Sequence, residues 1–392
     1  MKITDIISDN FTPKWDVIES IDEFKRLSET PQSLKFHKEG NVYEHTKLVC
    51  SRMADIINGK VSFIRNEEPS NEQKTALMAA AVCHDLGKAT STKWNEELQE
   101  WKTKNHGAEG ERITRLLFFD EPNIQLREKV CYMVRRHMTL HHIFDVEEKI
   151  NSRMMSLMGE QASVYEMVCL NYADSLGSIN DQNTPEEVMS RLNRVLALEF
   201  SINKTHEDLY ESHYGFRRTL TDNSPNVYVM MGVAGSGKST YAQRFLPNAM
   251  QLSRDVIREE LGYAKEGEKV KCTKEQESNV TEVFNKKALN ALAKGQNIII
   301  DNMNLTKRYR DMFHREYGSF NPRYTYIYVE APTINTNITR RDGQIPEKEI
   351  ERMVNSIDFP EGHEYDSLRL VKQTELGGEI VATPFDVKNV NI

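Results

Sequence analysis

The spacing of apolar side chains changes partway along the chain. In residues 74–88, 127–138 and 163–177, apolar positions recur at intervals of three and four residues. This spacing gathers them on one face of a helix, and runs of β-branched residues are few in this part of the chain. The pattern therefore predicts a first domain built from helices.

Later apolar segments are short and rich in β-forming residues. They are NVYVMMGV (226–233), NIIIDN (297–302) and YTYIYVEAP (324–332), separated by polar stretches that suit helices. Strands that alternate with helices are typical of a parallel α/β sheet. The polar stretch 219–226, which contains Pro225, has the composition of a linker. We therefore expect an all-α domain over 1–218 and an α/β domain over 219–392.

Composition and charge bear on the binding partners and the cellular compartment of the protein. The 392 residues carry a net charge of −8, so contact with nucleic acid would need local basic clusters. The five cysteines are scattered without a CxxC pair, which fits a reducing compartment. The N-terminal MKITDIISDN has no signal-peptide core, and no apolar stretch approaches membrane-spanning length. We expect a cytoplasmic protein without membrane contact.

A glycine-rich loop follows the first β-rich run. VYVMMGVAGSGKST (227–240) matches GxxxxGK[ST] between a predicted strand and a predicted helix. Backbone N–H groups of such a loop cradle phosphates, Lys238 would reach the β- and γ-phosphates, and Ser239 would hold Mg²⁺. We expect the loop to bind ATP or another nucleoside triphosphate through Gly232, Gly235, Ser236, Gly237, Lys238, Ser239 and Thr240. The loop alone leaves kinase and ATPase open.

Two later segments carry candidate groups for phosphoryl transfer. In QLSRDVIREEL (251–261), Asp255 could accept a proton from an attacking hydroxyl, and Arg258 could hold a phosphate of the acceptor. An ordinary surface helix would account for the same spacing. Asp301 ends the apolar run NIIID, where an open α/β sheet places its ligands. It could orient Arg258 or assist Mg²⁺.

Paired arginines in residues 337–353 precede a stretch containing Gly343 and Pro346. Such a segment is typical of a mobile lid that lays guanidinium charge on the transferring phosphoryl group. A solvated charge run is the alternative. The segment KRYR (307–310) is a local basic patch that could contact a nucleic-acid backbone, and a solvated helix face would explain it equally well.

GVAGSGKST, SRDxxR, a strand ending in DNMN and a later N-x-x-R segment before Ile-Pro occur in that order. Over residues 225–365 the chain resembles the 5′-hydroxyl polynucleotide kinases of phage and bacterial RNA repair. The resemblance implies that Asp255 is the general base, that Arg258 binds the acceptor's 3′-phosphate and that Arg340, or Arg341, is the lid arginine. Met303 stands where this family usually has Thr, which puts the role of Asp301 in doubt.

The helical half contains the phrase CHDLGKA (83–89). Adjacent His84 and Asp85 offer nitrogen and oxygen ligands, which suit a divalent transition metal. Further candidate ligands lie far apart along the chain: His45, His106, His137 and Asp174. Each alone is typical of an ordinary core or surface residue. As a set of six they could hold two metals bridged by Asp85, which would polarise a phosphoryl group and supply hydroxide.

The order H…HD…H…H…D over residues 30–180 resembles the HD-domain phosphohydrolases. FHKEGNVYEHT (36–46) also resembles the opening of the HD domain in some tRNA nucleotidyltransferases. The resemblance implies that one metal is held by His45, His84, Asp85 and Asp174, and that His106 and His137 complete a second site. Lys88 would touch the substrate phosphate or remain solvated. His141 and His142 could each replace or assist His137.

An HD phosphohydrolase before a kinase of this type resembles the bifunctional bacterial end-healing enzymes called HD-Pnk. The resemblance implies RNA or DNA ends with 5′-OH and 2′,3′-cyclic, 2′- or 3′-phosphate as substrates, with a separate ligase acting afterwards. Its cofactors would be ATP with Mg²⁺ and one or two divalent transition metals. Two other readings remain open: an HD nucleotidase fused to a nucleoside or metabolite kinase, and a regulatory protein that senses nucleotides without turnover.

Overall fold

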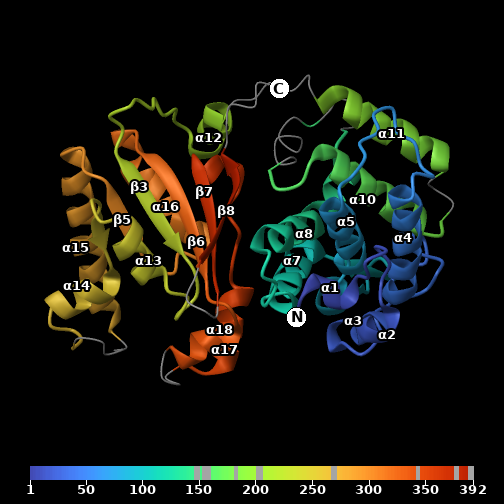
Figure 1. Ribbon diagram of the computed structural model, residues 1–392, viewed down its shortest axis with the longest axis horizontal. Helices are drawn as coiled ribbons and strands as arrows, with labels where there is room; N and C mark the ends of the chain where they lie inside the picture. The colour runs from blue at the N-terminus through green and yellow to red at the C-terminus, as the bar shows by residue number, and fades with distance from the viewer. Residues whose placement is uncertain are drawn as a thin grey trace. The chain divides into compact units, whose positions relative to one another are not determined.

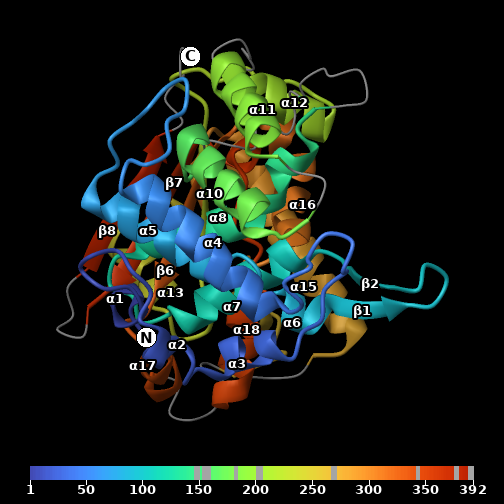
Figure 2. The same ribbon diagram turned by 90° about the vertical axis from the view of Figure 1, so that its right-hand side faces the viewer.

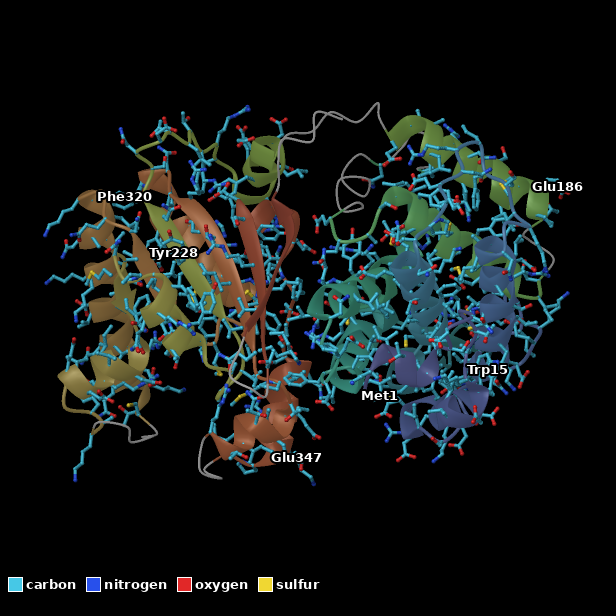
Figure 3. All side chains as sticks on the ribbon, viewed as in Figure 1. Met1, Trp15, Glu186, Tyr228, Phe320 and Glu347 are labelled. Carbon is cyan, nitrogen blue, oxygen red and sulfur yellow. The ribbon has the colours of Figure 1, made fainter. Side chains whose placement is uncertain are left out.

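The computed structural model divides the chain into two compact units (Figure 1). The first unit contains Met1–Asn203 and the second Lys204–Val390. The structure describes residues 1–144, 151, 160–180, 184–199, 206–265, 272–340, 345–374 and 379–386. Side chains fill the space between the helices of the first unit and between sheet and helices in the second (Figure 3).

The first unit is helical, as the apolar spacing predicts. Its described helices are α1 (Ile3–Ile6), α2 (Trp15–Ile18), α3 (Asp22–Ser28), α4 (Val42–Ile57), α5 (Asn71–Cys83), α6 (Lys88–Ser91), α7 (His106–Leu117), α8 (Ile124–Arg136), the 3₁₀ helix η1 (His137–His142), α10 (Val164–Gly177) and α11 (Pro185–Leu198). Side-chain caps fix where several of them begin. Ser70 and Gln73 form a capping box at α5, and Ser163 and Glu166 form another at α10.

The core of this unit forms around α5. Every residue from Ala76 to Cys83 is buried, and four of those eight are alanines. Small side chains allow the neighbouring helices α4, α8 and α10 to pack closely against α5. The chain leaves this buried helix directly into His84 and Asp85, so the core carries both side chains into the interior of the unit.

A hairpin interrupts the helices of the first unit. β1 (Thr92–Asn95) and β2 (Glu100–Thr103) pair antiparallel, with Trp94 opposite Trp101. Figure 2 shows the hairpin projecting from the helical body of its own unit. The helical periodicity of the sequence does not indicate this element, because the strands are short and mostly polar.

The second unit is an α/β domain. Its described elements are α12 (His206–Tyr214), β3 (Asn226–Met231), α13 (Lys238–Phe245), β4 (Met250–Leu252), α14 (Arg254–Glu260), α15 (Lys274–Ala293), β5 (Ile298–Asp301), α16 (Lys307–Tyr317), η3 (Gly318–Phe320), β6 (Arg323–Glu330), α17 (Ile334–Thr339), α18 (Glu347–Asn355), η4 (Gly362–Glu364), β7 (Ser367–Gln373) and β8 (Glu379–Asp386). The strand order is β4-β5-β3-β6-β7-β8. The first five strands of that order are parallel, and β8 adds an antiparallel edge.

Both faces of the sheet are covered, which explains why its strands are almost uniformly apolar. Met230, Ile299 and Val329 pack on one face against Tyr241 and Ala242 of α13. Tyr326 faces the other side, where its hydroxyl bonds to His314 of α16 at 2.9 Å. The predicted strands and helices of this unit thus form three layers, with the sheet between α13 on one face and α16 on the other.

The boundary between the units lies before the predicted linker at 219–226. The segment from α12 to β3 belongs to the second unit because its side chains are anchored there. Arg218 pairs with Asp366 at 2.8 Å, and the Tyr214 hydroxyl donates to Asp311 at 3.0 Å. The sequence alone assigns α12 to the first domain, because a short amphipathic helix does not reveal which core it packs on.

The fold class is confirmed: a helical first unit and a parallel α/β second unit. All five cysteines are free thiols. Among the described residues, no helix has both the length and the apolar character needed to cross a membrane.

Candidate metal centre and nucleotide site

Five separate elements of the first unit bring the six predicted ligands together. His45 lies on α4, His84 and Asp85 follow α5, His106 begins α7, His137 begins η1, and Asp174 lies on α10. All six residues are buried. Their ligand atoms form two groups, each within 4.8 Å: His45, His84 and Asp174 (the first ligand cluster), and Asp85, His106 and His137 (the second ligand cluster).

Asp85 connects the two ligand clusters. Its Oδ2 lies 3.2 Å from Nε2 of His84, in the first cluster. Its Oδ1 lies 3.4 Å from Nε2 of His106 and 3.7 Å from Nε2 of His137, in the second. One carboxylate therefore presents one oxygen to each cluster, which is the arrangement of a ligand that bridges two metals.

The donor set fits cations. Asp85 is only 1% exposed, and neither of its oxygens accepts a hydrogen bond from a described residue. The Lys88 ammonium forms an ion pair with it at 2.7 Å. Burying a carboxylate that accepts no hydrogen bond is costly, and the Lys88 ammonium offsets this cost at Oδ2, so Oδ1, which faces the second ligand cluster, suits a bound cation. Nitrogen and carboxylate ligands in this mixture suit divalent transition metals.

The histidines are oriented so that Nε2 is the ligand atom. Nδ1 of His84 donates to the Ala81 carbonyl at 2.8 Å, and Nδ1 of His137 donates to the Val134 carbonyl at 2.7 Å. These bonds fix the tautomer and leave the Nε2 lone pair facing the cluster. Burial lowers the pKa of His137 to about 3, so this imidazole is neutral and ready to ligate.

His45 is held by a carboxylate that the sequence reading missed. Its Nδ1 lies 3.0 Å from Oε1 of Glu39, and the same oxygen accepts from His37 at 2.8 Å. Burial alone would lower the pKa of His45, but the carboxylates of Asp174 and Glu39 raise it to about 9. A proton therefore occupies His45 until a cation displaces it. FHKEGNVYEHT contains Glu39, but nothing in its spacing indicates this contact.

The remaining predicted residues of this unit lie at the edge of the clusters. Lys88 also donates to Gln32 at 2.9 Å, so its ammonium is held beside Asp85. His141 lies 3.1 Å from Oδ2 of Asp174. His142 is exposed. His137 and His141 thus face different clusters, because they lie on a 3₁₀ helix rather than on one face of an α-helix.

Gly87 sets the distance between the HD segment and α7. A Cβ at this position would lie 2.0 Å from the His106 carbonyl oxygen and 2.6 Å from the Gly110 nitrogen. Only glycine allows this close approach of two backbones. The approach is what brings His106 to the carboxylate of Asp85.

The second unit carries the glycine-rich loop between β3 and α13, as predicted. Gly232, Gly235 and Gly237 all have positive φ, at 148°, 78° and 88°. At Gly237 a side chain would meet Gln373 at 2.4 Å, and the residue is the N-cap of α13. Lys238 is the first residue of that helix, followed by the exposed Ser239 and Thr240. The helix N-terminus and the inward-turned loop together suit bound phosphate.

Polar atoms without partners lie around this loop. Among the described residues, Ser236 Oγ, Asp301 Oδ1 and Asn337 Oδ1 are buried and accept no hydrogen bond. Asp301 ends β5 next to β3, and its other oxygen accepts from Gln251 at 2.7 Å. Buried acceptors of this kind suit a hydrated cation or a ligand donor. Asp301 does not contact Arg258 in this structure, so the suggested orienting role is not observed.

Arg258 is oriented instead by Glu277 of α15. Its guanidinium bonds to both oxygens of Glu277, at 2.9 and 3.1 Å, and to Asp255. Glu277 also accepts from Arg254 at 2.7 Å. Hydrogen bonding to Arg258 lowers the pKa of Glu277 to about 2, so it stays ionised. Asp255 itself is 83% exposed at the start of α14. No motif indicates Glu277, because it comes from a separate helix.

Arg340, the predicted lid arginine, contacts the glycine-rich loop. Arg340, at the end of α17, donates to the Gly235 carbonyl at 3.3 Å and to the Gln373 side chain. Arg341 lies outside the described residues. In the predicted basic patch KRYR, Arg310 is fully buried and paired with Glu364 at 2.8 Å. That arginine therefore cannot serve a surface for nucleic acid, and only Arg308 and Tyr309 of the patch are exposed.

Comparison with protein families finds one match within each unit. A family model of the HD domain matches residues 42–176, which include all six metal-ligand candidates. A family model of an AAA domain, a P-loop domain, matches residues 227–360, which run from the glycine-rich loop past Arg340. No protein of curated function matches the chain.

Proposed function

We propose that this chain, an HD phosphohydrolase domain joined to a P-loop kinase-like domain, restores both ends of a broken polynucleotide. The helical unit would remove a 2′,3′-cyclic, 2′- or 3′-phosphate, and the α/β unit would phosphorylate the 5′-OH end with ATP. The observation that carries the proposal is the combination in one chain of six buried metal ligands centred on Asp85 with a P-loop followed by Asp255 and Arg258. A separate ligase would then find both ends ready for sealing.

In the helical unit, the two ligand clusters would hold one or two divalent transition metals. When bound, such metals polarise the phosphoryl group and make water nucleophilic at neutral pH. The residues of the chain orient and balance this site. Glu39 fixes the ring of His45, and the ammonium of Lys88 offers positive charge to a substrate phosphate beside Asp85.

In the α/β unit, the glycine-rich loop and Lys238 would hold the phosphates of ATP, with Mg²⁺ on Ser239. Asp255 is exposed and can accept the proton of an incoming 5′-hydroxyl. Arg258, held by Glu277, would bind a phosphate of the acceptor strand. Arg340, which donates to the Gly235 carbonyl, would lay its charge on the transferring phosphoryl group.

The test uses an oligoribonucleotide with a 5′-OH and a 2′,3′-cyclic phosphate. Labelled substrate is incubated with and without ATP and Mg²⁺, Mn²⁺ or Ni²⁺, and both ends are analysed. We expect 5′ phosphorylation only with ATP, and loss of the cyclic phosphate without it. A free nucleoside that is phosphorylated as fast as the oligonucleotide would instead favour a metabolite kinase.

Two variants assign each activity to its own site. Asp255→Asn removes the proposed base, so 5′ phosphorylation falls by about 10²- to 10⁴-fold while hydrolysis persists. Asp85→Asn removes the bridging charge, so bound metal and hydrolysis are lost while phosphorylation persists. The exposed Asp222→Asn serves as the matched control for both. Survival of both activities in either variant would contradict the assignment.

A further inference from the structure

Hairpin β1–β2 presents two indoles to solvent. Trp94 and Trp101 lie opposite each other, with ring centroids 5.3 Å apart, and are 41% and 36% exposed. The two rings meet edge-to-face, with an interplanar angle of 68°, and in the described part of the chain neither contacts another aromatic ring. Large aromatic side chains contribute most when they bury their surface. Two of them side by side on a projecting hairpin suit a ligand with flat, stackable faces.

The hairpin is connected directly to the metal centre at both of its ends. Lys88, which pairs with Asp85, lies four residues before β1, and His106 lies three residues after β2. The hydroxyls of Thr92 and Thr103 bond at 2.9 Å and close the base of the hairpin. Trp101 is five residues from His106, a reach of at most about 18 Å. That length corresponds to about five stacked nucleotides.

The hairpin carries lysines near its base and acids toward its turn. Lys93 and Lys102 are cross-strand partners, and Lys104 follows β2. Like charges directly opposite each other destabilise a hairpin unless an anion lies between or beside them. Glu100 pairs with Lys102, and the other acids, Glu96 and Glu97, lie at the turn, away from the metal centre. Because successive side chains point to opposite faces of a strand, Lys93 and Lys102 lie on the face of the hairpin opposite the two indoles. A stacked ligand is therefore indicated by the indoles and by the connection of the hairpin to the ligand clusters.

We propose that the Trp94–Trp101 hairpin is a stacking platform for the unpaired bases of a single-stranded polynucleotide whose phosphate-bearing end lies at the two ligand clusters. The inference rests on the proposed function of the helical unit and names the form of its substrate. Single-stranded bases expose faces that can stack on indoles, whereas the bases of a duplex are covered by their neighbours.

The competing explanation is that the two indoles serve only the hairpin. Cross-strand aromatic pairs do stabilise strands. That role requires each indole to contact its partner, and it requires no ligand. The two explanations differ in whether the indoles sense a bound strand, which spectroscopy measures without turnover.

The first experiment measures fluorescence of the full-length Trp15→Phe variant, in which the hairpin supplies both remaining indoles. The probe is a ten-nucleotide oligoribonucleotide with a 3′-OH, which gives the phosphohydrolase nothing to cleave. We expect quenching that saturates with the single strand. The same sequence as a duplex is expected to leave the emission unchanged. Absence of quenching, or equal quenching by the duplex, would overturn the proposal.

The second experiment compares substrates of different length. For Trp94→Leu/Trp101→Leu, kcat/KM for removal of the terminal phosphate of a ten-nucleotide strand is expected to fall about 10-fold or more through KM. A mononucleotide 2′,3′-cyclic phosphate should be hydrolysed at the unchanged rate. Leucine keeps an apolar cross-strand contact, and circular dichroism checks the fold. Leu98→Ala, at the exposed turn, is the control with an apolar loss but no stacking partner.

The outcomes separate this inference from the proposed function. If Trp94→Leu/Trp101→Leu lowers kcat/KM equally for the ten-nucleotide strand and for the mononucleotide, the indoles support the metal centre itself. That result would overturn the proposal of a stacking platform. A change in oligomeric state on substitution would make the hairpin a protein contact, with the same consequence. Quenching by the single strand in an enzyme without phosphohydrolase activity would sustain the platform and reject the proposed hydrolysis.

Discussion

Two glutamates, Glu39 and Glu277, position the groups on which both sites depend. Glu39 holds His45 and His37 through one oxygen, and its other oxygen accepts from the Ile179 backbone N–H at 2.9 Å. Glu277 holds Arg258 and Arg254. Glu277 belongs to no motif, and the FHKEGNVYEHT segment contains Glu39 without indicating its contacts. At the scale of residues, the sequence therefore indicates the candidate ligand and catalytic side chains. It does not indicate the carboxylates that orient them.

We expect Glu277→Gln to weaken the acceptor site proposed for the α/β unit. Loss of the charged hydrogen bonds frees the Arg258 side chain, so KM for the oligonucleotide acceptor rises about tenfold or more. KM for ATP should stay the same, because the glycine-rich loop is untouched. Steady-state kinetics with each substrate varied in turn would measure both constants.

The matched control is Glu275→Gln, which removes the same charge from an exposed position in the first turn of the same helix. It should change neither constant. An equal rise in both KM values for Glu277→Gln would mean that the residue supports the fold rather than the aim of Arg258.

At the scale of elements, close contacts between backbones decide the geometry. α7 approaches the HD segment at Gly87, and α17 approaches the glycine-rich loop at Gly235, where a Cβ would lie 2.5 Å from the Asn337 carbonyl oxygen. In both places two elements distant in the chain meet where no side chain fits. The helices themselves are predictable from spacing and caps, but these approaches are not.

Gly87→Ala is expected to separate α7 from the HD segment. The new methyl group would meet the His106 carbonyl, so the backbone must shift, at a cost of about 1–3 kcal/mol. His106 then withdraws from Asp85, and the protein should bind less metal at the second ligand cluster. Metal content by elemental analysis, together with urea unfolding, measures both effects.

A control for stability is Ala79→Gly, inside α5, which costs about 1 kcal/mol through helix propensity and a further amount through the loss of its buried methyl group. It should keep its full metal content. If Gly87→Ala also keeps full metal content, the close approach is not what positions His106.

At the scale of the whole molecule, the second unit buries two histidines that have little affinity for protons. Burial and the nearby Arg218 hold the pKa of His314 well below its usual value. Burial, followed by Lys307, lowers the pKa of His363 to about 3. Both imidazoles bind a proton readily once the chain unfolds.

Stability of the second unit should therefore fall as the pH drops below about 6.5. Below that pH the two histidines are protonated in the unfolded state but not in the folded state. Each histidine therefore lowers the free energy of unfolding by up to about 1.4 kcal/mol per pH unit. The loss from His363 continues to about pH 3, and above pH 6.5 it vanishes. Urea unfolding followed by circular dichroism at pH 7.5, 6.5 and 5.5 would measure the slope.

His363→Gln keeps an acceptor for Lys307. It should reduce the slope of the free energy of unfolding against pH by the contribution of one titrating group. The exposed His142→Gln, in the first unit, should leave it unchanged. Tryptophan emission reports separately on the first unit, because all three tryptophans lie there. An unaltered slope in His363→Gln would show that its proton affinity does not change on unfolding.

The sequence by itself determined the type and order of the elements, the glycine-rich loop and the six ligand candidates. It could do so because helical spacing, strand runs and short motifs are properties of neighbouring residues. Only the tertiary structure decided that Asp85 presents one oxygen to each ligand cluster, that Glu277 rather than Asp301 holds Arg258, and that α12 belongs to the second unit. Those contacts depend on how elements that are distant in the sequence pack together. The residues next to each of them in the chain do not indicate that packing.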